Sequence, residues 1–182
     1  KYTGSAFDSP VVFQAMEAQN SDSDNQMRVK VEDNNIVVIF TDGAGGERVL
    51  TGVTPTTNVW VHFVVSVANE IGTLFVNGTK IGQVNNVYTK FVNPVIGYGR
   101  TSNNDLQEYN GYLSDVYFVD GHALPPTTFG KEFDVGWGPL DSSVVKANIG
   151  AVENPYDSRP NYDQEWSAGF TCPQGFFGGA TK

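Results

Sequence analysis

The chain has 182 residues, with 11 Lys and Arg against 20 Asp and Glu, which gives a formal net charge of −9. A surface with this acidic excess repels phosphates, so we expect neither nucleic acid binding nor attachment to anionic membranes. Cys172 is the single cysteine and the chain has two histidines, which excludes an intrachain disulfide framework and a cysteine-based zinc site. No apolar run approaches the roughly 20 residues that a membrane span requires, so we expect no membrane insertion.

Short runs of Val, Thr, Ile, Phe and Tyr alternate along the chain with Gly, Asn, Asp and Pro, a pattern typical of an all-β protein. The predicted strands, in chain order, are Val11–Met16, Met27–Glu32, Asn35–Phe40, Arg48–Thr51, Val59–Ala68, Thr73–Asn77, Lys80–Gln83, Val95–Gly97 and Tyr112–Val119. Dipeptides such as Asn77–Gly78 at or near the ends of these runs predict hairpin turns, because Asn and Gly tolerate a positive φ.

The clearest strand is Val59–Ala68, in which every second residue from Val59 to Val67 is apolar. The alternate positions, from Trp60 to Ala68, are also partly apolar. A strand with two partly apolar faces is typical of the centre of a sheet in a two-sheet sandwich.

Helix signals are scarce. The stretch Pro125–Phe129 predicts one short turn, and Asp141–Ala147 predicts a short helix with Asp141 as its N-cap. From Gly136 to Lys182 the chain is rich in Gly, Pro and aromatic residues and shows little alternation. We therefore expect a sandwich domain over residues 1–135, followed by an irregular extension over residues 136–182 that packs on the sandwich or on a neighbouring subunit.

Several motifs occur in an order that resembles the laminin-G/concanavalin-A-like jelly rolls. A Trp60-Val-His62 strand is followed by a Leu-Phe-Val-Asn-Gly hairpin that ends at Gly78, then by an Ile-Gly pair at Gly97 and by a return strand that leads into an Ala-Leu-Pro turn at Pro125. The resemblance covers about residues 59–130. It implies an all-β, two-sheet antiparallel jelly-roll sandwich.

The second half is similar to a variant found in phage tail-fibre and other virion proteins, through the motif from Asp120 to Gly130 and the Trp-containing turn at Trp137. The stretches 154–161 and 164–167 are similar to marine phage tail proteins in particular. This similarity implies a non-enzymatic virion protein, a tail fibre or appendage, that binds host-surface polysaccharide. Its expected partners are sister subunits, with a trimer favoured, and other virion proteins. Two alternatives stay open: a purely structural capsid decoration or assembly joint, and a polysaccharide depolymerase.

Glycan binding requires a stacking aromatic side chain and planar polar groups, and loops on rigid sandwiches commonly carry such sites. The stretch from Gly97 to Asn110 supplies both kinds of group. Its candidate carbohydrate-binding residues are Tyr98, Arg100, Asn103, Asn104, Asp105 and Tyr109. The competing interpretation is an ordinary polar loop.

We expect no cofactor, although the resemblance allows Ca²⁺ at the sandwich rim. Calcium requires several hard oxygen ligands, and Asp22, Asp24 and Asp42 are the candidates. The sequence favours the competing interpretation, in which these are turn residues without a metal.

We also expect no catalytic residues. Trp60 and His62 are neighbours, but no second histidine or cysteine accompanies them, so we interpret them as fold residues. Related glucanases carry alternating carboxylates on one strand. The nearest pairs in this chain are Asp22 with Asp24 and Asp163 with Glu165, and both lie in predicted loops.

Overall fold

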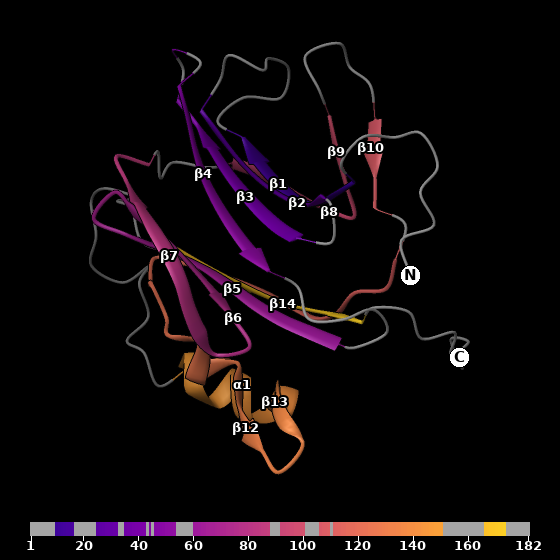
Figure 1. Ribbon diagram of the computed structural model, residues 1–182. Helices are drawn as coiled ribbons and strands as arrows, with labels where there is room; N and C mark the ends of the chain where they lie inside the picture. Colours follow the sequence, from indigo (N-terminus) through magenta and orange to yellow (C-terminus); the bar gives the residue numbers. More distant parts are fainter. Residues whose placement is uncertain are drawn as a thin grey trace.

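The computed structural model describes residues 10–16, 25–32, 35–42, 44, 46–53, 60–87, 92–100, 106–109, 111–150 and 166–173. Two five-stranded antiparallel sheets dominate it (Figure 1). We call them sheet 1, with strand order β4-β3-β2-β1-β8, and sheet 2, with strand order β11-β14-β5-β6-β7.

Sheet 1 consists of β1 (Val11–Met16), β2 (Gln26–Glu32), β3 (Asn35–Thr41), β4 (Glu47–Val53) and β8 (Val92–Ile96). Sheet 2 consists of β5 (Trp60–Ala68), β6 (Ile71–Val76), β7 (Thr79–Asn85), β11 (Ser114–Asp120) and β14 (Trp166–Pro173). The predicted all-β antiparallel sandwich is therefore confirmed, and β5 lies inside its sheet between β14 and β6, as its two apolar faces predict.

The main core lies between the two sheets. One face of β5 supplies Val61, Phe63, Val65 and Val67 to it, and Phe13, Met27 and Phe40 are among the side chains that sheet 1 contributes. Each of these side chains is nearly or fully buried. Burial of a large apolar side chain stabilises a fold by about 1.5–3 kcal/mol, so this cluster is the main source of stability.

A second apolar cluster lies on the other face of β5, around Val64. Residues after β11 cover it with a short 3-10 helix, a hairpin and an α-helix. These elements are η1 (Pro126–Thr128), β12 (Gly130–Phe133), β13 (Gly136–Pro139) and α1 (Ser142–Gly150). Phe129 and Val145 from this cover are 1 % and 0 % exposed, which explains why both faces of β5 are apolar.

The turn and the helix predicted within this cover are confirmed as η1 and α1. Helix α1 begins at Ser142, and the carboxylate of Asp141 accepts a hydrogen bond of 2.8 Å from the Ser143 N–H. This is the contact of an N-cap residue, which provides a partner for an N–H of the first helical turn. Among the described residues, no helix is long and apolar enough to cross a membrane.

The prediction of an irregular segment over residues 136–182 is wrong for the residues that the structure describes there. The boundary at 135/136 falls within the turn of the β12–β13 hairpin. Strand β14 pairs with β5 on one side and with β11 on the other. Its sequence, WSAGFTCP, shows little alternation of apolar and polar residues. Backbone hydrogen bonds to the neighbouring strands on both sides hold β14 in the sheet, and they do not require such alternation.

Candidate functional site

The predicted glycan-binding stretch forms a two-stranded antiparallel ribbon beside sheet 1 (Figure 1). Its strands are β9 (Tyr98–Arg100) and β10 (Leu106–Glu108). In this register Tyr98 is directly opposite Glu108. Directly opposed residues of an antiparallel pair project from the same face, with Cβ atoms about 4.5–5.5 Å apart. The ribbon therefore presents an aromatic ring beside a carboxylate.

Tyr98 is 39 % exposed and Glu108 is also exposed. Gly99 follows Tyr98 in β9 and lies very close to β1. A Cβ added to Gly99 would be 2.7 Å from a methyl carbon of Val11. Only a residue without a side chain allows this approach. The close contact fixes the ribbon to the sandwich, and alternation along β9 then directs Tyr98 to the opposite face.

Tyr109 has a different environment from Tyr98. Its ring is partly buried and packs against the main core, and its backbone N–H donates a 2.8 Å hydrogen bond to the Gly97 carbonyl. Tyr109 therefore anchors the end of the ribbon, although its residue type and position predict a binding residue like Tyr98. Only the backbone of Arg100 is described, and Asn103, Asn104 and Asp105 lie outside the described residues.

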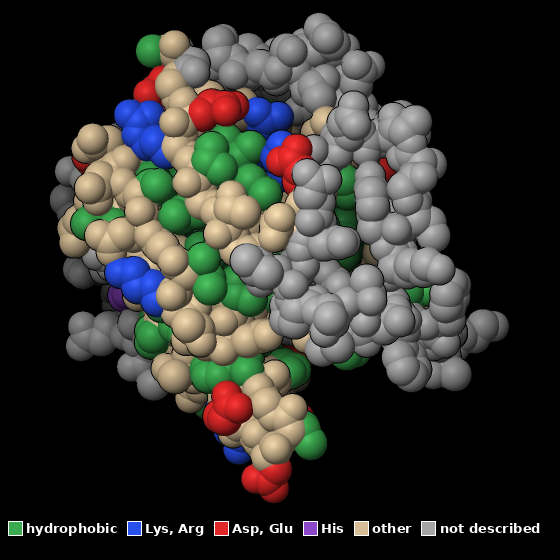
Figure 2. Space-filling view, viewed as in Figure 1, with side chains coloured by type: hydrophobic (Ala, Val, Ile, Leu, Met, Phe, Trp, Pro, Cys, Tyr) green, Lys and Arg blue, Asp and Glu red, His purple; other side chains and the backbone are tan. Residues whose placement is uncertain are grey.

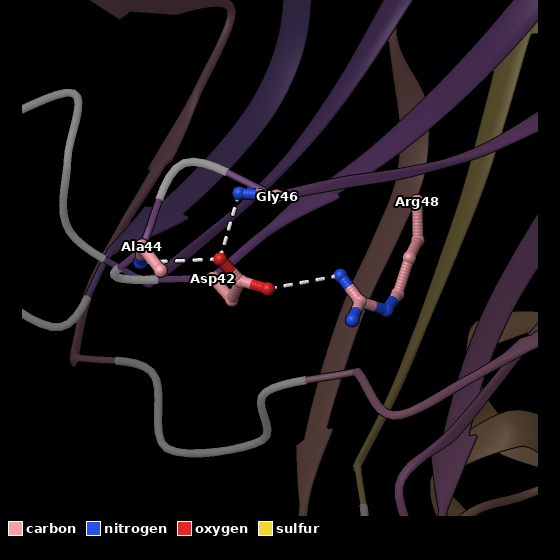
Figure 3. A network of polar contacts seen from close by, with 4 residues as sticks. All are labelled: Asp42, Ala44, Gly46 and Arg48. Carbon is pink, nitrogen blue, oxygen red and sulfur yellow. Dashed lines mark hydrogen bonds and ion pairs between the residues drawn. The ribbon is translucent and has the colours of Figure 1, made fainter.

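The calcium candidate Asp42 is engaged within its own hairpin (Figure 3). Its Oδ1 accepts hydrogen bonds from the backbone N–H groups of Gly46 at 2.7 Å and Ala44 at 3.1 Å, and its Oδ2 accepts one from Arg48 at 3.0 Å. The Gly46 hydrogen bond is the main cause of a lowered pKa of Asp42; partial desolvation opposes it, and Arg48 and Ala44 lower the pKa further. Asp42 therefore closes the β3–β4 turn.

The other two calcium candidates, Asp22 and Asp24, lie outside the described residues. Within the part of the chain that the structure describes, no group of three or more His, Cys, Asp or Glu side chains could hold a metal ion.

The third polar arrangement joins β5 to the β12–β13 hairpin. The indole Nε1–H of Trp137 donates a 2.9 Å hydrogen bond to Nδ1 of His62, which is only 4 % exposed. The backbone of His62 is bonded to Asn77: the His62 N–H donates to Asn77 Oδ1 at 3.0 Å, and the Asn77 N–H donates to the His62 carbonyl at 2.7 Å. Burial lowers the pKa of His62 to about 4, against an opposing effect of Asp115.

The interpretation of His62 as a fold residue agrees with this geometry, since its imidazole joins two elements. Its neighbour Trp60 is on the same face of β5 and is 44 % exposed. The pairing of His62 with Trp137, which is 75 residues away, has no signal in the sequence. Glu108 is likewise absent from the predicted carbohydrate-binding residues. Only the register of β9 and β10 places it beside Tyr98.

Two antiparallel sheets packed face to face, with a ribbon at one side, define the class of the protein as a β-sandwich of lectin-like architecture. Residues 1–127 match the family model described as the concanavalin A-like lectin/glucanases superfamily, and this match covers more than half of the chain. The chain therefore belongs to this family. Searches of curated proteins and of solved structures gave no significant match.

The family match ends within η1, so β12, β13, α1 and β14 all lie beyond it. Sheet 2 is nevertheless completed by β14. The hairpin and helix that cover its outer face are thus additions of this chain to the part that the family model matches.

Proposed function

We propose that this chain is a non-enzymatic, carbohydrate-binding domain and that its binding surface is the outward face of the β9–β10 ribbon. The observation that carries the proposal is the register pair of Tyr98 and Glu108 on a ribbon fixed to the sandwich. An exposed aromatic ring can stack on the apolar face of a sugar ring, while a carboxylate accepts hydrogen bonds from its hydroxyl groups. The lectin/glucanase family is compatible with this function.

We further propose that the domain belongs to a phage tail fibre or similar appendage, where it attaches the particle to a host-surface polysaccharide. The motifs of the second half of the chain support this context. The low content of charged residues, 17 %, also suits neutral polar contacts with sugars and with sister subunits. In this proposal the domain is part of a homo-oligomer, with a trimer favoured.

Glycan-array screening of the intact chain tests the binding function, with Tyr98→Ala and Glu108→Gln as variants. Removing the stacking ring should weaken binding by at least about tenfold, which corresponds to about 1.4 kcal/mol. Phe133→Ala is the matched control, because Phe133 is 40 % exposed but lies on the β12–β13 hairpin, away from the ribbon (Figure 1).

No bound glycan, or equal losses in Tyr98→Ala and Phe133→Ala, would contradict the proposed surface. Reducing-sugar release from a bound polysaccharide would contradict the proposal that the domain is non-enzymatic. A sedimentation measurement of the oligomer tests the trimer separately, and a monomer at the concentrations of the array would contradict it.

A further inference from the structure

The β12–β13 hairpin projects from the body of the molecule, and acidic side chains lie on it (Figure 2). It is held to β5 by the hydrogen bond from Trp137 Nε1 to His62 Nδ1, and the two rings are 5.9 Å apart at an interplanar angle of 40°. The indole ring also covers the β6–β7 turn, because a Cβ placed on Gly78 would clash with it. Trp137 is therefore the point at which the hairpin contacts sheet 2.

This contact depends on the protonation state of His62. A neutral imidazole that accepts a hydrogen bond at Nδ1 carries its proton on Nε2, whereas an imidazolium is a donor at both nitrogens. Protonation at Nδ1 would therefore set two N–H groups against each other. It would also place a positive charge on a side chain that is almost fully buried, which is unfavourable without a close counter-charge.

We propose that the His62–Trp137 hydrogen bond is an acid-sensitive latch, and that protonation of His62 releases the β12–β13 hairpin from sheet 2 while the sandwich stays folded.

The burial of His62, and to a smaller extent the charges around it, set the pH at which the latch opens. Asp115 on β11 favours the protonated form, but desolvation outweighs it, so the pKa of His62 is about 4. Strands β5, β6, β13 and β14 contain no Asp, Glu, Lys or Arg. The titratable residue of β14, Cys172, is in register with Val61 rather than with His62. On the hairpin, Glu132 is in register with Trp137 and is exposed.

The release is expected to be local, because the two ends of the hairpin are attached independently. Phe129, just before β12, and Val145, in α1 after β13, are both buried in the second apolar cluster and stay there. Neither contact contains a group that titrates near pH 4. The main core likewise consists of apolar side chains, so acid acts on the latch before it acts on the sandwich.

Hydrogen exchange measured by NMR on the intact chain, between pH 7 and pH 3.5, tests the latch. We expect the protection factors of amides in β12 and β13 to fall by at least about tenfold as the pH falls from 6.5 to about 4, together with a shift of the Trp137 indole signal. Amides in the β2–β3 pairing should keep their protection over the same range. His62→Asn retains an acceptor oxygen near the Nδ1 position that does not titrate, and it should abolish the transition.

His122→Asn is the control, because it removes the other histidine and should leave the transition unchanged. If hairpin and β2–β3 amides lose protection at the same pH, or if His62→Asn opens like the wild type, the latch is refuted. If His62→Asn fails to fold, Trp137→Phe is the deciding variant. The protection factors of its hairpin amides at pH 7 should be as low as those of the wild type at pH 4. Unchanged protection in Trp137→Phe would equally overturn the proposal.

Discussion

The substitution Gly78→Ala tests how tightly the hairpin is packed against sheet 2. Gly78 is the second residue of the β6–β7 turn, with a φ of +75°, and it follows Asn77, whose φ is +46°. An alanine Cβ at this position would be 2.7 Å from Cη2 of Trp137 and closer still to two other ring carbons. The new methyl group thus meets both an unfavourable backbone conformation and an occupied space.

The two effects have separate magnitudes. An L-residue in the left-handed region costs about 1–2 kcal/mol, and the reduced freedom of the unfolded chain returns about 0.4–1 kcal/mol. The clash adds about 1–3 kcal/mol, as in other overpacked sites, because the His62 hydrogen bond restrains Trp137 from moving away. We therefore expect Gly78→Ala to lower the free energy of unfolding by about 2–4 kcal/mol.

Gly97→Ala is the matched control for the backbone effect. Its φ is +81°, and a Cβ there would have no heavy atom within 4 Å. Urea unfolding of both variants, followed by circular dichroism, should show a loss for Gly97→Ala of only about 1 kcal/mol. Equal losses in the two variants would refute the reasoning, and so would a Gly78→Ala loss that persists in full in a Trp137→Ala background.

Three further predictions concern stability. The pKa of His62 is about 4 in the folded chain against 6.5 when unfolded, so the unfolded chain binds more protons between these values. The free energy of unfolding should therefore rise with pH across this window by up to about 3 kcal/mol, and urea unfolding of His62→Asn should lack this slope. Phe129→Ala, at a position 1 % exposed, should cost about 3–5 kcal/mol, and a loss below about 1 kcal/mol in thermal melts would show that the second cluster contributes little. Glu70→Gly should stabilise the chain by about 0.5–1 kcal/mol, because Glu70 has a φ of +60° in the β5–β6 turn; unchanged urea midpoints would contradict this.

The local features of the sandwich were predictable because they depend on neighbours in the chain. Alternation over Val59–Ala68 follows the period of a strand, and Asn77–Gly78 forms the turn that its tolerance of positive φ predicts. The turn at Asn69 and Glu70 also has positive φ at both residues, although it contains no glycine. Here the pairing of β5 with β6 imposes the conformation on a residue that does not favour it.

The candidate site was predictable only in part, because its geometry depends on strand pairing as well as on neighbours in the chain. Tyr98 was identified by its type and its position in a polar stretch, but its opposition to Glu108 depends on the register of β9 and β10. Tyr109 has a similar sequence context to Tyr98, yet its ring packs against the core. Residue type indicates what a side chain can bind, whereas its direction depends on which face of a strand it occupies.

The sequence by itself determined the class of this protein: an antiparallel β-sandwich, with its central strand, its principal turns and the family to which it belongs. Only the tertiary structure decided that β14 completes sheet 2 between β11 and β5, and that Trp137 reaches His62 across 75 residues. The physical reason is the range of the interactions. Alternation and turn preference act over a few residues, while strand order and the burial of an imidazole depend on segments that meet only when the chain is folded.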